Sequence, residues 1–373
     1  MKKPRILLVS TAHPATDPRI VFRQCPTLAG QYDVTCALPN ADASVCAGVQ
    51  FWRLPYFRRV WWRVLLVSPL VLVRGLWLRP AVVQIFVPEL IPVALIFRLF
   101  GIRVVYEVQE NLYKKMHLKT QNRGVVLEQA FYRFDQLARR YFYLIFTEHG
   151  YLNTYTDLAK PSAIIYNYPL LPFLEPFRQT YRPDKTNPSF LLIGLLSEAR
   201  AFDTMVGALT QIKSDYPDFV VHLFGKKTFT DDWMRSLPGF TDVKENLRFY
   251  GYTDQRMALT YAAHATAGLA LLKPVGDYPD SYPTKLFEYM ALGLPVITSD
   301  FPLYRDVVEQ HGCGLCVPPA NPMAIVHALR YLIENPAEAA AMGDQGRRAV
   351  EMMYNWKTEA AKLTGFYCTL LPK

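Results

Sequence analysis

The feature that most constrains the fold is a repeated alternation of short apolar runs with longer segments of helical period. The runs are rich in Val, Ile and Leu without polar alternation, which is typical of strands buried on both faces of a parallel sheet. They lie at residues 4–10, 32–38, 49–56, 80–88, 102–110, 144–150, 162–169, 188–196, 219–225, 246–253 and 267–273. This rhythm predicts an α/β protein built from open, doubly wound parallel sheets.

The chain has 373 residues, which is too many for one ordinary core and suits two α/β domains. We expect a Rossmann-like N-terminal domain at 1–170 and a second domain at 188–353. The proline-rich segment 171–187 lacks a clear period and is the expected linker. Residues 354–373 are predicted to form a C-terminal helix.

The six cysteines do not form a disulfide framework in a chain of this size. Cys313 and Cys316 make a lone CxxC, which we interpret as small apolar fillers beside a glycine turn. The apolar run near the N-terminus is too short for a signal peptide. These observations favour a reducing, cytoplasmic setting.

The net charge of +9 is unevenly distributed. Residues 1–170 hold 21 Lys and Arg against 10 Asp and Glu, whereas the remaining residues hold 20 against 22. A basic first half and a nearly neutral second half indicate an anionic surface as a partner of the first half.

Residues 277–297, DYPDSYPTKLFEYMALGLPVI, are the most informative stretch for function. Pro283 suits a helix start, and Gly293 suits its end. A helix start offers backbone N–H groups to a phosphate, and Lys285 adds positive charge there. Asp280 before the helix and Glu288 within it can accept hydrogen bonds from hydroxyls. The stretch predicts a nucleotide-sugar site; a plain amphipathic helix is the alternative.

This stretch resembles the Glu-x7-Glu motif of glycosyltransferase family 4, whose members have the GT-B fold. Asp280 stands at the first Glu, and Glu288 is the second. The resemblance implies that Asp280 contacts the transferred sugar, that Glu288 contacts the ribose, and that Lys285 and Leu286 belong to the donor site. It also implies two Rossmann-like domains facing a central cleft, with 354–373 crossing back to the first domain.

Other segments of the second half resemble the same family. Residues 189–206 match its first donor-domain strand, with Gly194 at the conserved position. Arg200 falls where the family has a Lys, and Leu195 replaces its Arg. The resemblance therefore implies that Arg200 and Lys285 share the neutralisation of the donor diphosphate. Tyr252 and Thr253 lie where the family's loop wraps the nucleotide base.

Three segments of the first half, 11–24, 86–92 and 104–113, resemble entry motifs of one subgroup of the family. Each follows a predicted strand. Gln109 stands where that subgroup usually has His, so a proton relay through this position is not expected. The residues that the segments place in the cleft are the catalytic candidates His13 and Glu110, and the acceptor or cleft candidates Asp17, Arg19, Glu89 and Gln109. Singly, each also suits a cap, a turn or a salt bridge.

No Asp-x-Asp triplet follows a strand, so we expect no metal and no cofactor, with a UDP- or GDP-linked sugar as a substrate. The helix dipole and cationic side chains would stabilise the departing diphosphate. The resemblance further implies transfer with retention of configuration, with a phosphate oxygen accepting the proton of the attacking hydroxyl.

Residues 53–80 combine arginines and tryptophans with the apolar run 64–73. That run is too short to span a bilayer, which takes roughly 20 residues. The pattern instead suits a helix lying on anionic lipid, and an ordinary crossover helix is the alternative. The residues expected at the membrane are Arg58, Arg59, Trp61, Trp62 and Arg63. No nucleic-acid recognition module is visible.

The favoured function is a retaining glycosyltransferase that uses a nucleotide sugar and a glycan or polyprenyl-linked acceptor, peripheral on the inner face of the cell membrane. One alternative is another GT-B enzyme of nucleotide sugars, such as an epimerase. Another is an inactive GT-B subunit that supports a partner.

Overall fold

The computed structural model describes residues 3–42, 46–115, 125–178, 181 and 183–371. The chain forms two compact units, each with its own sheet and core. The first holds Met1–Asn167 and Lys357–Lys373, and the second holds Tyr168–Trp356. The first unit therefore takes its last helix from the far end of the sequence.

The sheet of the first unit has seven parallel strands in the order β3-β2-β1-β4-β5-β6-β7. The strand order reverses between β1 and β4, and such a reversal opens a crevice at the carboxyl ends of the strands. The strands are β1 (Arg5–Val9), β2 (Asp33–Pro39), β3 (Val49–Leu54), β4 (Val82–Ile85), β5 (Arg103–Val108), β6 (Tyr143–Phe146) and β7 (Ser162–Ile164).

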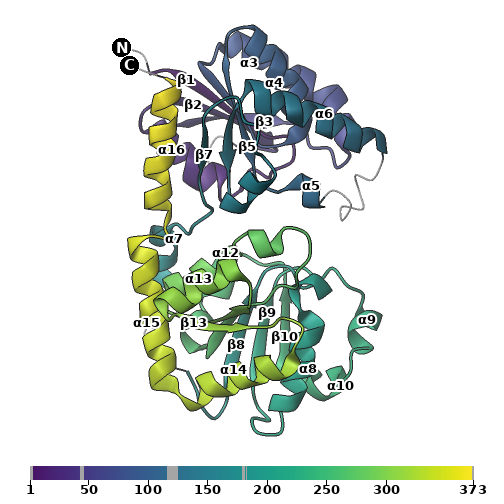
Figure 1. The fold of residues 1–373 in the computed structure, drawn as a ribbon, viewed down its shortest axis with the longest axis vertical. Helices are drawn as coiled ribbons and strands as arrows, with labels where there is room; N and C mark the ends of the chain where they lie inside the picture. The colour runs from purple at the N-terminus through teal and green to yellow at the C-terminus, as the bar shows by residue number, and fades with distance from the viewer. Residues whose placement is uncertain (1–2, 43–45, 116–124, 179–180, 182, 372–373) are drawn as a thin grey trace. The chain divides into compact units, whose positions relative to one another are not determined.

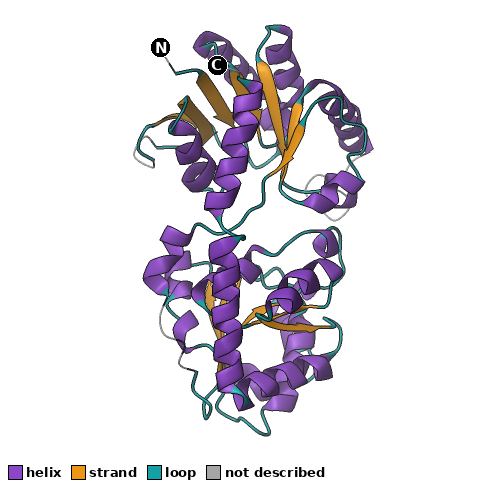
Figure 2. Ribbon diagram, turned by 60° about the vertical axis from the view of Figure 1, so that its left-hand side comes forward, coloured by secondary structure: helices purple, strands orange, loops and turns teal. Residues whose placement is uncertain are grey.

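Helices lie on both faces of this sheet (Figure 2). Figure 1 shows α3, α4 and α6 together on one side. The helices and helical turns of the first unit are η1 (Ile20–Gln24), α1 (Cys25–Ala29), α2 (Val60–Trp62), η2 (Arg63–Val67), α3 (Ser68–Leu78), η3 (Pro88–Leu90), α4 (Ile91–Leu99), α5 (Leu112–Lys115), α6 (Val125–Tyr141), η6 (His149–Asn153) and α16 (Trp356–Leu370).

α2, η2 and α3 form one continuous helix over 60–78. Its π-helical turn η2 ends directly before Ser68 and Pro69, and η1 likewise ends directly before Cys25 and Pro26. Proline has no N–H and its ring crowds the carbonyl four residues earlier, so a wider turn lets each helix continue through it. The helix of Pro26 thus continues into α1 after the π turn.

α16 packs on the first unit, beside the sheet (Figure 1). The Tyr367 hydroxyl donates a hydrogen bond to the Gln84 side chain on β4, and the buried Glu359 carboxylate accepts one from the Tyr166 amide at 2.8 Å. The predicted domain ended at 170 and the predicted helix began at 354, beside the observed divisions at 167 and 356.

The sheet of the second unit has six parallel strands in the order β10-β9-β8-β11-β12-β13. Its order reverses between β8 and β11, which repeats the plan of the first sheet. The strands are β8 (Ser189–Ile193), β9 (Val220–Phe224), β10 (Leu247–Gly251), β11 (Ala267–Ala270), β12 (Val296–Ser299) and β13 (Gly314–Val317).

The helices and helical turns of the second unit are α7 (Leu171–Leu174), η7 (Glu175–Phe177), η8 (Glu198–Arg200), α8 (Phe202–Ile212), α9 (Asp231–Arg235), α10 (Phe240–Val243), η9 (Lys244–Asn246), α11 (Gln255–Leu259), η10 (Ala262–His264), η11 (Tyr278–Asp280), α12 (Thr284–Leu292), α13 (Pro302–His311), α14 (Pro322–Glu334) and α15 (Pro336–Met352).

The segment expected to be a linker, 171–187, belongs to the second unit. It contains α7 and η7, and Glu175 forms an ion pair of 2.7 Å with Arg347 of α15. Each of these helices has a proline in its first turn and is only three or four residues long, which is too short to show a period. All six cysteines are free, and Cys316 lies on β13, a strand that was not predicted from the sequence.

The prediction of an α/β fold with two doubly wound parallel sheets is confirmed. In each sheet the central strands are buried on both faces. Ile6 of β1 lies between Val34 and Val82, and Gly268 of β11 lies between Leu191 and Val296. The sheet reversals put two separate sets of loops where ligands bind in such folds.

Candidate functional site

At the carboxyl edge of the second sheet, the backbone segments that follow two neighbouring strands lie very close together. Gly194 follows β8 with φ +138°, and Gly225 follows β9 with φ +140°. A Cβ at Gly225 would lie 1.8 Å from the Gly194 carbonyl oxygen, so only glycine fits there. Neither glycine covers its own backbone with a side chain, which leaves room for a close neighbour.

Arg200 lies over this edge. A Cβ built on Gly194 would be 2.8 Å from Arg200 Nη1. Ser197 holds the Arg200 amide at 3.2 Å, and Ala201 after it has the unusual φ of +53°. Arg200 Nε is buried and has no hydrogen-bond partner among the described residues. A buried cation with an unused donor is costly to keep, which suits a site for an anionic ligand.

α12 begins at Thr284, with Pro283 at the N-cap, and ends at Gly293, whose φ is +75°. Lys285 Nζ lies 2.6 Å from Glu288 Oε2, and both side chains are largely buried. Leu286 is fully buried in the core. Lys285 and Glu288, which are predicted to share one site, form a direct ion pair, and the predicted donor-site residue Leu286 packs in the core.

Tyr289 joins α12 to the glycine edge. Its hydroxyl accepts a hydrogen bond of 2.9 Å from the Ile193 amide, directly before Gly194. Burial raises the pKa of Tyr289, so it stays neutral. Lys285 precedes Tyr289 by one helical turn, so it lies on the same side of α12. The positive charge of Arg200 acts on the pKa of the same Tyr289, which places Arg200 near α12.

Gln255 is a member of this cluster that the sequence analysis missed. Its Nε2 donates a hydrogen bond of 2.8 Å to Glu288 Oε2. Gln255 starts α11, so this bond brings the preceding loop, with Tyr252 and Thr253, to the start of α12. Tyr252 is 92% exposed and is therefore available to a ligand.

Asp280 lies in the turn η11, directly before α12. The buried Tyr304 hydroxyl is 2.7 Å from the Tyr278 carbonyl oxygen and 2.9 Å from that of Ser281. These contacts fix the backbone on both sides of Asp280. Asp280 therefore lies in an anchored loop, and Lys285 and Glu288 lie in the helix that follows this loop.

The carboxyl edge of the first sheet encloses a cavity of about 700 Å³, within the usual range for small-molecule sites. It lies at the reversal between β1 and β4. Four of the predicted cleft residues, His13, Glu89, Gln109 and Glu110, line it. Its walls are largely apolar and come from the start of the 60–78 helix and from α4, α5 and α6.

The polar end of this cavity is tied together by hydrogen bonds. His13 Nδ1 lies 2.7 Å from the Ser10 hydroxyl, and Thr11 donates a bond of 2.8 Å to Glu89 Oε1. The same Glu89 oxygen is 3.0 Å from Arg63 Nε. Although this distance suits a hydrogen bond, Arg63 Nε has no aligned partner among the described residues, so the contact is an ion pair only.

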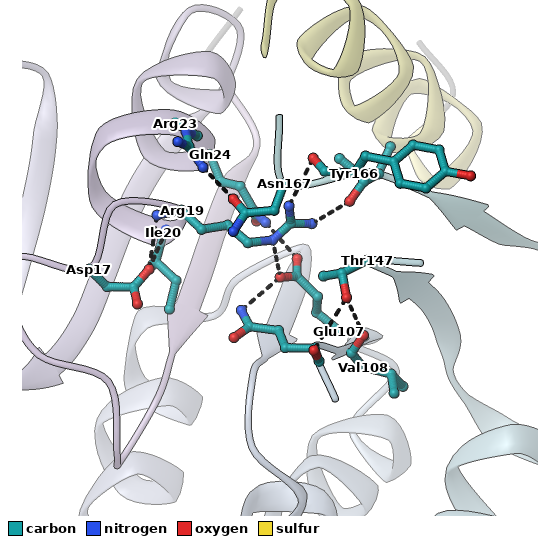
Figure 3. A network of polar contacts seen from close by, with 12 residues as sticks. Asp17, Arg19, Ile20, Arg23, Gln24, Glu107, Val108, Thr147, Tyr166 and Asn167 are labelled. Carbon is teal, nitrogen blue, oxygen red and sulfur yellow. Dashed lines mark hydrogen bonds and ion pairs between the residues drawn. The ribbon is translucent and has the colours of Figure 1, made fainter. Parts of the chain in front are cut away.

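Two predicted cleft residues do not line the cavity. Asp17 accepts hydrogen bonds from the Arg19 and Ile20 amides at 3.0 and 2.8 Å and so caps a turn. Arg19 is 4% exposed and donates to Glu107 at 2.7 Å and to the Ile165 carbonyl at 2.7 Å. Both residues therefore hold the fold together, as Figure 3 shows.

Glu107 is the centre of the network in Figure 3, and the sequence analysis did not single it out. It is fully buried and accepts four hydrogen bonds. The donors are Arg19 at 2.7 Å, Gln24 at 2.5 Å, Gln84 at 2.9 Å and Gln109 at 2.8 Å. Because Gln109 also lines the cavity, the network fixes the position of a cavity residue.

The helix over 60–78 is longer than its central apolar run suggested. It continues through Arg63 and Arg74 and, among the described residues, is the one helix long and apolar enough to cross a membrane. Val67, Val71 and Gly75 face the core, and a Cβ at Gly75 would lie 2.4 Å from Phe97 of α4. The exposed side chains of the helix include Trp61, Trp62, Leu65, Leu66, Val73 and Trp77.

Within the described ranges, no group of three or more His, Cys, Asp or Glu side chains is arranged to hold a metal ion. The predicted membrane residues Arg58 and Arg59 are exposed just before the helix, whereas Arg63 points inward to Glu89.

Comparison with known proteins supports this description. Residues 175–349 match the model of the family described as glycosyl transferases group 1. The chain is 27% identical over 181 residues to phosphatidyl-myo-inositol mannosyltransferase of Mycobacterium leprae, a match that covers 48% of this chain and 46% of the relative. The match thus spans about half the length of each protein.

Solved structures share the fold across the whole chain. Sucrose-phosphate synthase from Thermosynechococcus elongatus has a TM-score of 0.77 at 18% identity, with 99% of each chain covered. Anabaena Alr3699/HepE in complex with UDP-glucose has a TM-score of 0.70 at 12% identity, covering 98% of this chain and 100% of that one. The predicted GT-B fold is confirmed, and residues 175–349 match the glycosyl transferase model.

Proposed function

We propose that this chain, which carries a group 1 glycosyl transferase domain on a GT-B fold, transfers a sugar from a nucleotide diphosphate donor to a lipid-linked or glycan acceptor. The observation that carries the proposal is the cluster of Lys285, Glu288 and Gln255 at α12, beside Arg200 and the glycine edge. This cluster lies within residues 175–349, the part that matches the family. A UDP-glucose complex of a protein with the same fold supports a nucleotide sugar as the ligand.

The charges of the side chains indicate which part of the donor each one binds. Arg200 and Lys285 are cations near a helix start, a combination that favours a diphosphate. Glu288 is an acceptor of hydrogen bonds and suits the two ribose hydroxyls. Without a ligand it is neutralised by Lys285 at 2.6 Å. Binding would transfer Lys285 to the diphosphate and leave Glu288 to the ribose.

The chemical step that we propose is transfer with retention. Asp280 orients the sugar, and the cations stabilise the negative charge that develops on the leaving diphosphate. A phosphate oxygen accepts the proton of the attacking acceptor hydroxyl. This route needs no metal and no enzyme nucleophile. His13 and Glu110 line the cavity of the first unit and are proposed to bind the acceptor there.

We further propose that the first unit rests on an anionic membrane at its cytoplasmic face. The exposed apolar residues of the 60–78 helix form one stripe, since Trp61, Leu65, Pro69, Val73 and Trp77 recur at every fourth position. Arg58 and Arg59 at one end and Arg74 near the other suit lipid phosphates. The face of Val67, Val71 and Gly75 packs on the unit, which favours a helix lying on the bilayer.

The donor site is tested with the Glu288→Gln variant, because Gln keeps the size and removes the charge. We expect its affinity for UDP or GDP to fall about 10–100-fold, the cost of about 1.5–3 kcal/mol for a lost charged hydrogen bond. Isothermal titration calorimetry measures the affinity, and sugar transfer is measured in parallel. Glu309→Gln, an exposed residue of α13, is the matched control. Wild-type affinity in Glu288→Gln would refute the site.

The same titrations separate the alternatives. A chain that binds nucleotide sugar but never transfers or isomerises the sugar is an inactive subunit. Isomerisation of the donor sugar without an acceptor would identify an epimerase. A thermal-shift screen of UDP-, GDP- and dTDP-sugars identifies the base, because a ligand at 100 times its Kd stabilises by about 2.7 kcal/mol.

Membrane binding is tested by flotation with anionic vesicles at low salt. The double variant Leu65→Ser/Trp77→Ser should lose binding, because each side chain would otherwise bury its apolar surface for about 1.5–3 kcal/mol. Leu137→Ser, an exposed leucine of α6, is the control. Unchanged flotation of the double variant would exclude this helix as the contact.

A further inference from the structure

The cavity of the first unit is divided into a polar and an apolar part. His13, Gln109 and Glu110 lie at its polar end, at the carboxyl ends of β1 and β5. The apolar lining residues come from four helices and include Val60, Val64, Pro92, Leu112, Phe131 and Phe134. A free sugar would leave these apolar walls unused, whereas a ligand with a hydrocarbon part would cover them.

Arg63 supplies a cation in this otherwise acidic cavity. It comes from the same helical turn as Val60 and Val64, and its side chain is 12% exposed. Its Nε has no aligned hydrogen-bond partner among the described residues, and the nearby Glu89 oxygen already accepts from Thr11. A phosphate oxygen would satisfy this buried donor. Arg63 therefore gives the cavity an anion-binding group next to its apolar wall.

The apolar wall continues into the proposed membrane surface. Trp61 lines the cavity and is also 52% exposed, on the stripe that includes Leu65 and Trp77. A hydrocarbon chain leaving the cavity beside Trp61 would enter the bilayer without crossing water. The cavity therefore joins a membrane surface to a polar end at the sheet edge.

We propose that this cavity binds a lipid in which a single hydrocarbon chain is joined to a phosphate. The phosphate lies against Arg63, the chain lies along Val64 and the α6 side chains, and a head group carried on the other side of the phosphate presents the acceptor hydroxyl to His13 and Gln109. The inference deepens the proposed function by naming the acceptor class, and it rests on that function.

The test uses three probes below their critical micelle concentrations: dodecyl phosphate, dodecyl maltoside and inorganic phosphate. Isothermal titration calorimetry on the full chain should show that dodecyl phosphate binds at least about 10-fold more tightly than the other two, since a charged hydrogen bond contributes about 1.5–3 kcal/mol. If dodecyl maltoside bound as tightly as dodecyl phosphate, the cavity would not recognise the phosphate. If inorganic phosphate bound as tightly as dodecyl phosphate, the cavity would not recognise the hydrocarbon chain.

Two variants locate the binding. Ala130→Trp fills the cavity from α6, and its control Gln136→Trp changes an exposed position of the same helix. Arg63→Gln removes the cation, and Arg133→Gln is its exposed control. We expect Ala130→Trp to lose dodecyl phosphate binding and Gln136→Trp to keep it. In Arg63→Gln the affinity for dodecyl phosphate should fall to that for dodecyl maltoside, and in Arg133→Gln it should not change. Wild-type binding in Ala130→Trp would overturn the proposal.

UDP and GDP titrations of the same proteins keep the two hypotheses apart. Nucleotide binding in the wild type without dodecyl phosphate binding would refute the lipid cavity and leave the glycosyltransferase proposal intact. Absence of nucleotide binding would refute the proposed function itself. Two-chain phosphatidylinositol binding in preference to dodecyl phosphate would refute the single chain.

Discussion

The two units share one plan and present opposite chemistry at the same place. Each sheet reverses its strand order beside its first strand, and each collects candidate residues at the carboxyl ends there. The first unit, from the basic half of the chain, lines its cavity with Glu89, Gln109 and Glu110. The second, from the nearly neutral half, holds Arg200 over a glycine edge and Lys285 on α12.

Net charge and site charge therefore have different origins. The excess arginines of the first half include Arg58, Arg59 and Arg74 on the surface near the 60–78 helix, away from the cavity. Site charge is set by a few residues of the loops and helix starts between strands. The comparison shows that one sheet topology accepts either kind of site, and that the loops decide the chemistry.

The largest expected effect tests whether the buried carboxylate of the first unit is structural. Glu107→Leu leaves the Arg19 guanidinium buried without its partner, which should cost about 3–5 kcal/mol of unfolding free energy. Urea unfolding measures this, with the exposed Glu128→Leu as the control. The nucleotide affinity of the folded variant should be unchanged. An unchanged midpoint would mean that the Glu107 network does not stabilise the first unit.

The next effect tests whether the cation of the second unit is functional. Arg200→Gln should lower nucleotide diphosphate affinity by about 1.5–3 kcal/mol, since it removes a charged hydrogen bond. Its unfolding free energy should not fall, because Arg200 Nε has no partner to lose among the described residues. Calorimetry and urea unfolding are compared with Arg235→Gln on the surface of α9. A loss of stability without a loss of affinity would reverse the assignment.

A smaller effect concerns the glycine edge. Gly225→Ala places a Cβ 1.8 Å from the Gly194 carbonyl and demands φ +140° from alanine. Strain of about 1–3 kcal/mol should appear in the unfolding free energy, together with weaker nucleotide binding. In Gly251→Ala the new Cβ meets nothing within 4 Å, so its loss of stability should be smaller. Equal losses in the two variants would argue against a tight backbone contact.

The smallest effect is a pH dependence confined to the second unit. Burial, with a contribution from Arg248, lowers the pKa of His222 below its ordinary 6.5. The neutral imidazole is favoured in the folded state, so its stabilisation is fully present above about pH 6.5 and is lost as the pH falls through the lower folded value. Urea unfolding between pH 7 and 5 should show this loss, and His222→Gln should reduce it. If the unfolding free energy of His222→Gln fell with pH as steeply as that of the wild type, His222 would not be the cause of the pH dependence.

Much of the fold was predictable because strand and helix periods are local. The donor cluster was also accessible, since Asp280, Lys285 and Glu288 lie within one short motif. Gln255 was missed because its bond to Glu288 depends on how two loops meet in space. β13 was missed because Gly314 and Cys316 do not resemble strand residues.

The first unit was harder to read because similar polar residues have different roles there. Asp17 and Arg19 stand in a motif beside His13, yet they cap and support the fold while His13 lines the cavity. Glu107 could have been noticed as a charge inside an apolar strand, because a buried parallel strand tolerates a carboxylate only if several donors surround it.

The hydrogen bond from Gln109 to Glu107 also gives the amide a role at a position where the resemblance to the family led us to expect a His. An imidazole beside a buried carboxylate would gain a proton readily and change its behaviour across neutral pH. An amide donates the same bond at any pH, and its second N–H and its oxygen remain for a ligand. Ligand binding to Gln109 at this wall of the cavity should therefore be the same at acidic and at neutral pH.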